Sequence, residues 1–123
     1  MAVKLVSSTK IYLDARQLLD IILDIVPNFP KAYKFTIGSK MEDLAVEIIH
    51  DIAAAYINKD KAETAKHLTE FQARFETLKT LIRVAGERKW ILGKGKFATL
   101  IELMDGIGKQ SSAWKNTTMQ KMV

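Results

Sequence analysis

Apolar residues between Leu68 and Ala85 recur at alternating intervals of three and four, and this rhythm limits what the chain can fold into. Six side chains follow it without a break: Leu68, Phe71, Phe75, Leu78, Ile82 and Ala85. Such spacing puts all six on one face of an α-helix, the kind of seam found where helices pack at a shallow angle. The rest of the chain must therefore supply apolar faces that cover this seam.

Three further segments carry helical periodicity of the same kind. The first covers residues 8–26, with Ser7 or Ser8 as its expected N-cap, and its inward positions are Ile11, Ala15, Leu18, Ile22 and Ile25. The second covers residues 36–57, with Ile37, Met41, Leu44, Ile48, Ile52 and Tyr56 facing inward. The fourth helix, residues 94–117, has the seam Phe97, Leu100, Met104, Ile107, Ser111 and Trp114.

The central seam belongs to a third helix over residues 60–87, for which Asp60 is the expected N-cap. Four long helices with short connections predict one all-α domain over residues 1–123, an antiparallel up-down-up-down four-helix bundle. No strand pattern competes with it. Extra apolar residues on the first helix suggest burial on two sides, and Gly106 and Gly108 suggest a close backbone approach, since each costs a helix about 1 kcal/mol relative to alanine.

The amino-acid composition excludes several classes of site. The chain has no cysteine, which excludes disulfides, thiolate nucleophiles and sulfur-ligated metal sites. No signal peptide and no membrane-spanning stretch can be recognised, so we expect a cytoplasmic protein that does not interact with membranes.

Positive charge is concentrated in one part of the chain. The formal net charge is +5, and the segment from Arg74 to Lys96 accounts for all of it. Seven residues in that segment are candidate nucleic-acid-binding residues: Arg74, Lys79, Arg83, Arg88, Lys89, Lys94 and Lys96. Lysine and arginine in one patch neutralise phosphates with little regard to base sequence. The alternative is a solvated helix face followed by a charged loop.

Residues capable of catalysis are sparse. Glu47 and His50 form a Glu-x-x-His pair, but a di-metal bundle needs this motif twice, and Thr64 stands where a second motif ending at His67 would need glutamate. We therefore expect no metal, no cofactor, no catalytic residue and no enzyme activity. Trp90 could either close the end of the core or stack on a base or a partner.

Three stretches resemble a known family: FPKAYKFTIGSKMEDLAVEIIHDI, FETLKTLIRVA and FATLIELMDGIGKQSSAWKN. Together they are similar to the four-helix-bundle accessory variability determinant proteins of diversity-generating retroelements, from about Tyr12 to Asn116. The Ile-Gly-Lys stretch ahead of Trp114 favours this family over a related one, the S23-like bundle proteins encoded by intervening sequences of ribosomal RNA.

The resemblance implies a homopentameric barrel with a positively charged surface. Such a protein would bind the retroelement's reverse transcriptase and associate with RNA or DNA, supporting mutagenic copying of a template without chemistry of its own. The alternative is an S23-like structural bundle that acts only as a protein-interaction scaffold.

Overall fold

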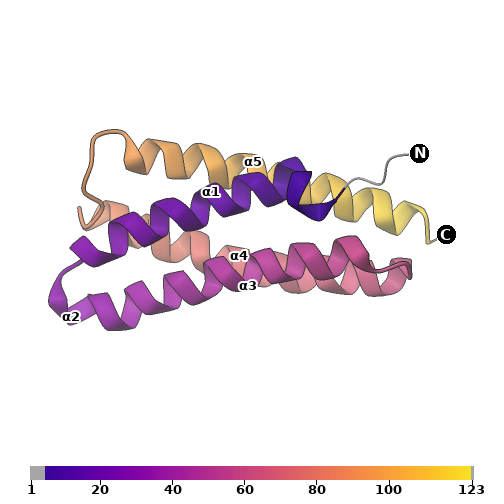
Figure 1. The fold of residues 1–123 in the computed structure, drawn as a ribbon, viewed down its shortest axis with the longest axis horizontal. Coiled ribbons are helices and arrows are strands. Elements are labelled where there is room, and N and C mark those ends of the chain that lie inside the picture. Colours follow the sequence, from indigo (N-terminus) through magenta and orange to yellow (C-terminus); the bar gives the residue numbers. More distant parts are fainter. Residues whose placement is uncertain (1–4, 123) are drawn as a thin grey trace.

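Four long helices pack side by side in the computed structural model, which describes residues 5–122 (Figure 1). They are α1 (Lys10–Ile25), α3 (Ser39–Ile57), α4 (Lys61–Glu87) and α5 (Lys96–Gln120). Helix α1 packs on α3 and α5, and α4 packs on the same two, so α1 and α4 lie diagonally opposite. Residues 5–122 contain no strand. The structure therefore confirms an all-α four-helix bundle.

Short elements fill the connections. They are the 3-10 turns η1 (Val6–Ser8) and η2 (Val26–Asn28), the single turn α2 (Lys31–Tyr33) and the π-helical segment η3 (Lys34–Gly38). The start of α1 and the end of α5 lie at one end of the bundle (Figure 1), as expected when four helices run alternately up and down. Within the described part of the chain, no helix combines the length and apolar character needed to cross a membrane.

The core consists of the seams that the periodicity predicts. Every seam residue from Leu68 to Ala85 on α4 is buried, as are all five predicted positions on α1. On α3 and α5 the middle of each seam is buried, whereas the predicted seam residues near the helix ends are only partly covered: Ile37, Tyr56, Phe97 and Trp114. Helix α1 also leaves Leu13 and Leu23 exposed in the single chain.

The start of α1 differs from the sequence-based expectation. Its N-cap is Thr9, because Ser7 and Ser8 belong to the preceding 3-10 turn, where the Ser8 hydroxyl donates to the carbonyl of Leu5. At α4 the expected cap is confirmed, since the Asp60 carboxylate accepts a hydrogen bond from the Ala62 N–H at 3.1 Å.

The α1–α3 connection is more helical than the sequence suggests. Pro30 stands at the N-cap of α2 with an extended backbone, and the chain then stays helical through η3 into α3. Gly38 permits this continuation because a Cβ there would lie 2.6 Å from the Cγ1 of Val26. The backbone after α1 and the start of α3 can therefore approach closely.

A second close approach lies at the end of α4. The ring of Phe97 covers Gly86 so closely that a Cβ on Gly86 would meet ring atoms at 2.3 Å. The prediction that another part of the backbone approaches α5 closely at Gly106 and Gly108 is wrong for the single chain. A Cβ at Gly106 would meet nothing within 4 Å, and one at Gly108 would make ordinary contact with Phe75 at 3.7 Å.

These two environments predict opposite effects of the same substitution. We expect Gly86→Ala to lower the free energy of unfolding by about 1 kcal/mol, because displacement of the Phe97 ring outweighs the better helix propensity of alanine. We expect Gly106→Ala to raise it by about 1 kcal/mol, since propensity acts there alone. Urea unfolding of both variants measures the difference, and shifts of the same sign would contradict this interpretation of the packing.

Candidate nucleic-acid interface

Two connecting segments meet at the end of the bundle opposite the chain termini (Figure 1). They are residues 26–38, between α1 and α3, and residues 86–97, which run from the last two residues of α4 through the connection to the first two residues of α5. Tyr33 from the first stacks on Trp90 from the second, with ring centroids 4.7 Å apart and an interplanar angle of 22°. Phe29 packs on the same tryptophan at 5.4 Å. Trp90 therefore joins the two segments and packs partly against the core.

The backbone after α4 turns sharply away from the helix. The N–H of Trp90 donates to the carbonyl of Ala85 at 2.9 Å, and Lys89 adopts a φ of 63° between them. This is the left-handed position that closes many helices and that glycine usually occupies. A lysine there costs about 1 kcal/mol relative to glycine, so a basic side chain is held where backbone preference alone would select against it.

The two segments together carry the charge excess of the whole protein. We call residues 26–38 and 86–97 the basic end. It contains one acidic residue, Glu87, and six basic residues: Lys31, Lys34, Arg88, Lys89, Lys94 and Lys96. Its excess of five equals the formal net charge of +5, so the remainder of the chain is neutral.

The basic residues of the basic end are not neutralised within the molecule. None of the six forms an ion pair within 4 Å in residues 5–122. Arg88 instead lies over two aromatic rings, 5.5 Å from the centroid of Trp90 and 5.9 Å from that of Tyr33. This contact orients the guanidinium and leaves its charge unbalanced.

Lys79 and Arg83 line a different feature, a groove of about 910 Å³ between α4 and α5. Lys79 pairs with Glu76 in this groove, and Lys109 pairs with Asp105 on its other wall. Three basic and three acidic side chains line it in all, namely Lys79, Arg83, Lys109, Glu76, Glu102 and Asp105. The groove therefore has no formal net charge and does not extend the basic end.

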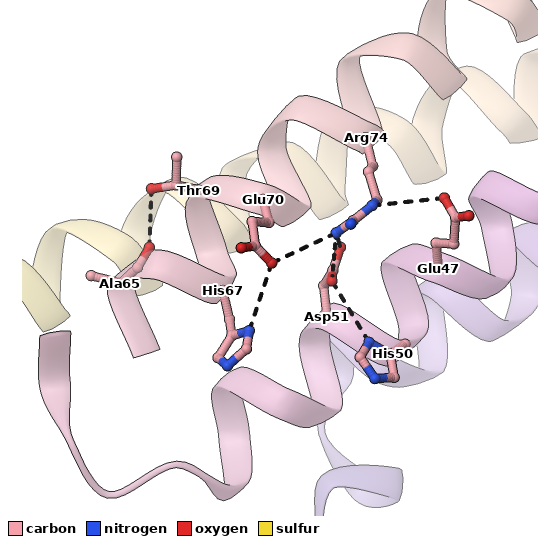
Figure 2. Close-up of polar contacts among 8 residues, drawn as sticks. All are labelled: Glu47, His50, Asp51, Ala65, His67, Thr69, Glu70 and Arg74. Atoms are coloured by element: carbon pink, nitrogen blue, oxygen red, sulfur yellow. Dashed lines mark hydrogen bonds and ion pairs between the residues drawn. The ribbon is translucent and has the colours of Figure 1, made fainter. Parts of the chain in front are cut away.

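Arg74 is part of an acidic cluster between α3 and α4 (Figure 2). Its Nη1 donates to both carboxylate oxygens of Asp51, at 2.8 and 2.7 Å, and Asp51 is buried. Glu47 and Glu70 lie 3.7 and 3.9 Å from the same guanidinium. The hydrogen bond to Asp51, followed by the nearby carboxylate charges, raises the pKa of Arg74, which stays protonated.

Arg74 is thus separated from the other candidates in both position and charge. It precedes Arg88 by 14 residues on a continuous helix, about 21 Å along its axis. Its positive charge is more than balanced by the carboxylates around it. We assign Arg74 to the joining of α3 and α4.

The Glu47–His50 pair does not form a ligand set. Glu47 is directed to Arg74, whereas the Nδ1 of His50 lies 3.8 Å from Asp51 (Figure 2). His67, on α4, has its Nδ1 buried without a hydrogen bond, 3.9 Å from Glu70. Among the described residues, no three histidine, aspartate or glutamate side chains are grouped so that they could hold a metal ion.

Lys31 and Lys34 were not among the candidates chosen from the sequence. They lie more than fifty residues from Arg88, in a segment where charge looks balanced when the chain is read linearly. The expected topology of the bundle could have indicated that these two lysines lie near Arg88. In an up-down-up-down bundle, the first and third connections lie at the same end.

The Arg74 cluster generates a stability prediction. Arg74→Met keeps most of the side-chain stem but leaves the buried Asp51 carboxylate without its partner, and we expect a loss of about 2 kcal/mol in unfolding free energy. Lys79→Met on the same helix is the matched control, because its partner Glu76 is exposed and such pairs contribute about 0.5 kcal/mol or less. Equal losses in thermal or urea unfolding would contradict the assignment of Arg74.

Comparison with known proteins gives the family. A search of curated proteins finds no match. A family model described as bAvd-like matches residues 5–118, which is nearly all of the described chain. The match includes α1, α3 and α4 in full, α5 up to residue 118, and both segments of the basic end. The chain therefore belongs to the bAvd-like family of accessory variability determinant proteins.

Proposed function

We propose that this protein is a non-enzymatic accessory protein of a diversity-generating retroelement that binds RNA or DNA through its basic end. Membership of the bAvd-like family suggests the accessory role. The observation that carries the nucleic-acid part is the unbalanced charge at the basic end, where six basic residues have no ion-pair partner within residues 5–122. The rest of the described chain is close to neutral and has no charge excess of this size.

Cations without ion-pair partners suit contact with a phosphate backbone. Each lysine or arginine that neutralises a phosphate releases condensed counterions, which gives affinity that depends little on sequence and falls with salt. We further propose that the protein assembles as a homopentamer. Each copy would then present one basic end, and several weak sites on one particle bind a long nucleic acid far more tightly than one site does.

Charge reversal tests the basic end. We expect a variant with Arg88, Lys89, Lys94 and Lys96 all changed to glutamate to lose RNA binding in fluorescence anisotropy. In any binding that remains, each phosphate that is no longer neutralised makes the negative slope of log K against log salt shallower by about 0.7 to 0.9. Circular dichroism and light scattering should show unchanged helicity and particle mass.

The matched control reverses four exposed lysines at the opposite end: Lys59, Lys61, Lys66 and Lys121. It changes the net charge by the same amount, so RNA binding should persist, though weakened by the lower overall charge. Equal loss of binding in both variants would show that net charge, and not the basic end, determines the interaction.

The proposed protein partner is the reverse transcriptase of the same retroelement. We expect the two proteins to co-purify when co-expressed, including after nuclease treatment and at a salt concentration that removes RNA. If they separate under all conditions, the S23-like alternative is favoured, in which the bundle is a protein-interaction scaffold without a role in copying.

A further inference from the structure

Phe35 is the most exposed aromatic side chain within residues 5–122. It lies in η3 within the basic end, and 73% of its surface is accessible. A phenylalanine that stays in water forgoes the favourable free energy of burying its ring. The packing between α1 and α3 does not use this ring, since the buried residues of the connection are Val26, Phe29 and Gly38, which precede and follow Phe35 in the sequence.

The surroundings of Phe35 are basic. The Nζ of Lys34 lies 5.7 Å from the centroid of its ring. Lys31 is one helical turn earlier, and Arg88 is held over the Tyr33–Trp90 stack that joins the two segments of the basic end. An exposed ring with one cation over it and further cations in the same segments fits a ligand that offers planar rings and phosphates together.

The backbone around Phe35 is fixed before any ligand arrives. Tyr33, two residues earlier, is stacked on Trp90, and Gly38, three residues later, is packed against Val26 at a distance that excludes a side chain. A ring on such a support loses little conformational freedom on binding, so more of the stacking free energy appears as affinity.

We propose that the basic end recognises single-stranded nucleic acid, with an unpaired base stacked on Phe35 and the neighbouring phosphates bound by Lys31 and Lys34. This inference rests on the proposed function and adds to it a choice between strand states. Cations alone bind duplex and single strand alike, but a base can stack on a protein ring only when its face is not already covered by base pairs above and below.

Three substitutions at Phe35 separate stacking from other uses of an exposed ring. Phe35→Ala removes the ring, Phe35→Leu keeps apolar surface but no π-face, and Phe35→Trp keeps a larger π-face. Ile57→Ala is the matched control, because Ile57 is equally exposed, at 74%, and lies at the opposite end of the bundle. Affinities are measured by fluorescence anisotropy for a labelled oligouridine of about 12 nucleotides and for an RNA duplex of the same length.

We expect Phe35→Ala and Phe35→Leu each to weaken oligouridine binding by about tenfold, as for loss of one stacked base, and Phe35→Trp to retain it. Duplex affinity should not change, and neither should the salt dependence of oligouridine binding, because no charge is removed. A double variant with Lys31→Ala and Lys34→Ala should instead make the negative slope of log K against log salt shallower by about 0.7 for each phosphate that is no longer bound.

Several results would overturn the proposal. If Phe35→Leu binds oligouridine as tightly as the unaltered protein, the ring serves as apolar surface for a protein partner. Equal losses on duplex and single strand, or no loss at all, would remove the strand preference while leaving the proposed function intact. If the unaltered protein binds neither RNA, the proposed function itself fails.

Discussion

The packing of four apolar seams into one core is the constraint from which the other features follow. Each seam runs along most of a long helix, and it is removed from water only when the helices lie nearly parallel around a common axis. Helices that follow each other along the chain must then alternate in direction. This alternation brings residues 26–38 and 86–97 to one end, although some fifty residues of α3 and α4 separate them. The basic end is therefore a consequence of how the core is buried.

The location of each cation decides what its charge can do. Arg74 lies in the middle of α4, where the neighbouring helix presents Glu47 and Asp51 across a short distance, and its charge stabilises the contact between the two helices. The six cations of the basic end lie at or near the connections between the long helices, and none of them forms an ion pair within the described residues. Arg74 and Arg88 are residues of the same type with different roles. Arg74 joins α3 to α4, whereas Arg88 contributes to a charged surface.

In the turn after α4, tertiary packing holds a backbone conformation that the local sequence disfavours. Lys89 holds a left-handed backbone that glycine would adopt more easily, while Trp90 is fixed by Tyr33 and Phe29. The same aromatic contacts orient Arg88 and support the backbone that carries Phe35. Packing at this end of the bundle therefore holds the backbone that carries the unpaired cations and the exposed ring of Phe35. Unpaired charge and an exposed ring do not stabilise the isolated chain, but both suit the binding of a polyanion.

The sequence by itself determined the four helices, the residues that form their seams and the N-cap Asp60, because these depend on spacing and on chemistry within one turn of helix. It also determined the net charge and a stretch, Arg74 to Lys96, whose charge excess equals it. It did not show that Arg74 is paired, that Gly106 faces open space or that Lys31 and Lys34 belong with Arg88. Only the tertiary structure decided these points, since each depends on which side chains from distant segments meet, and linear distance along the chain carries no such information.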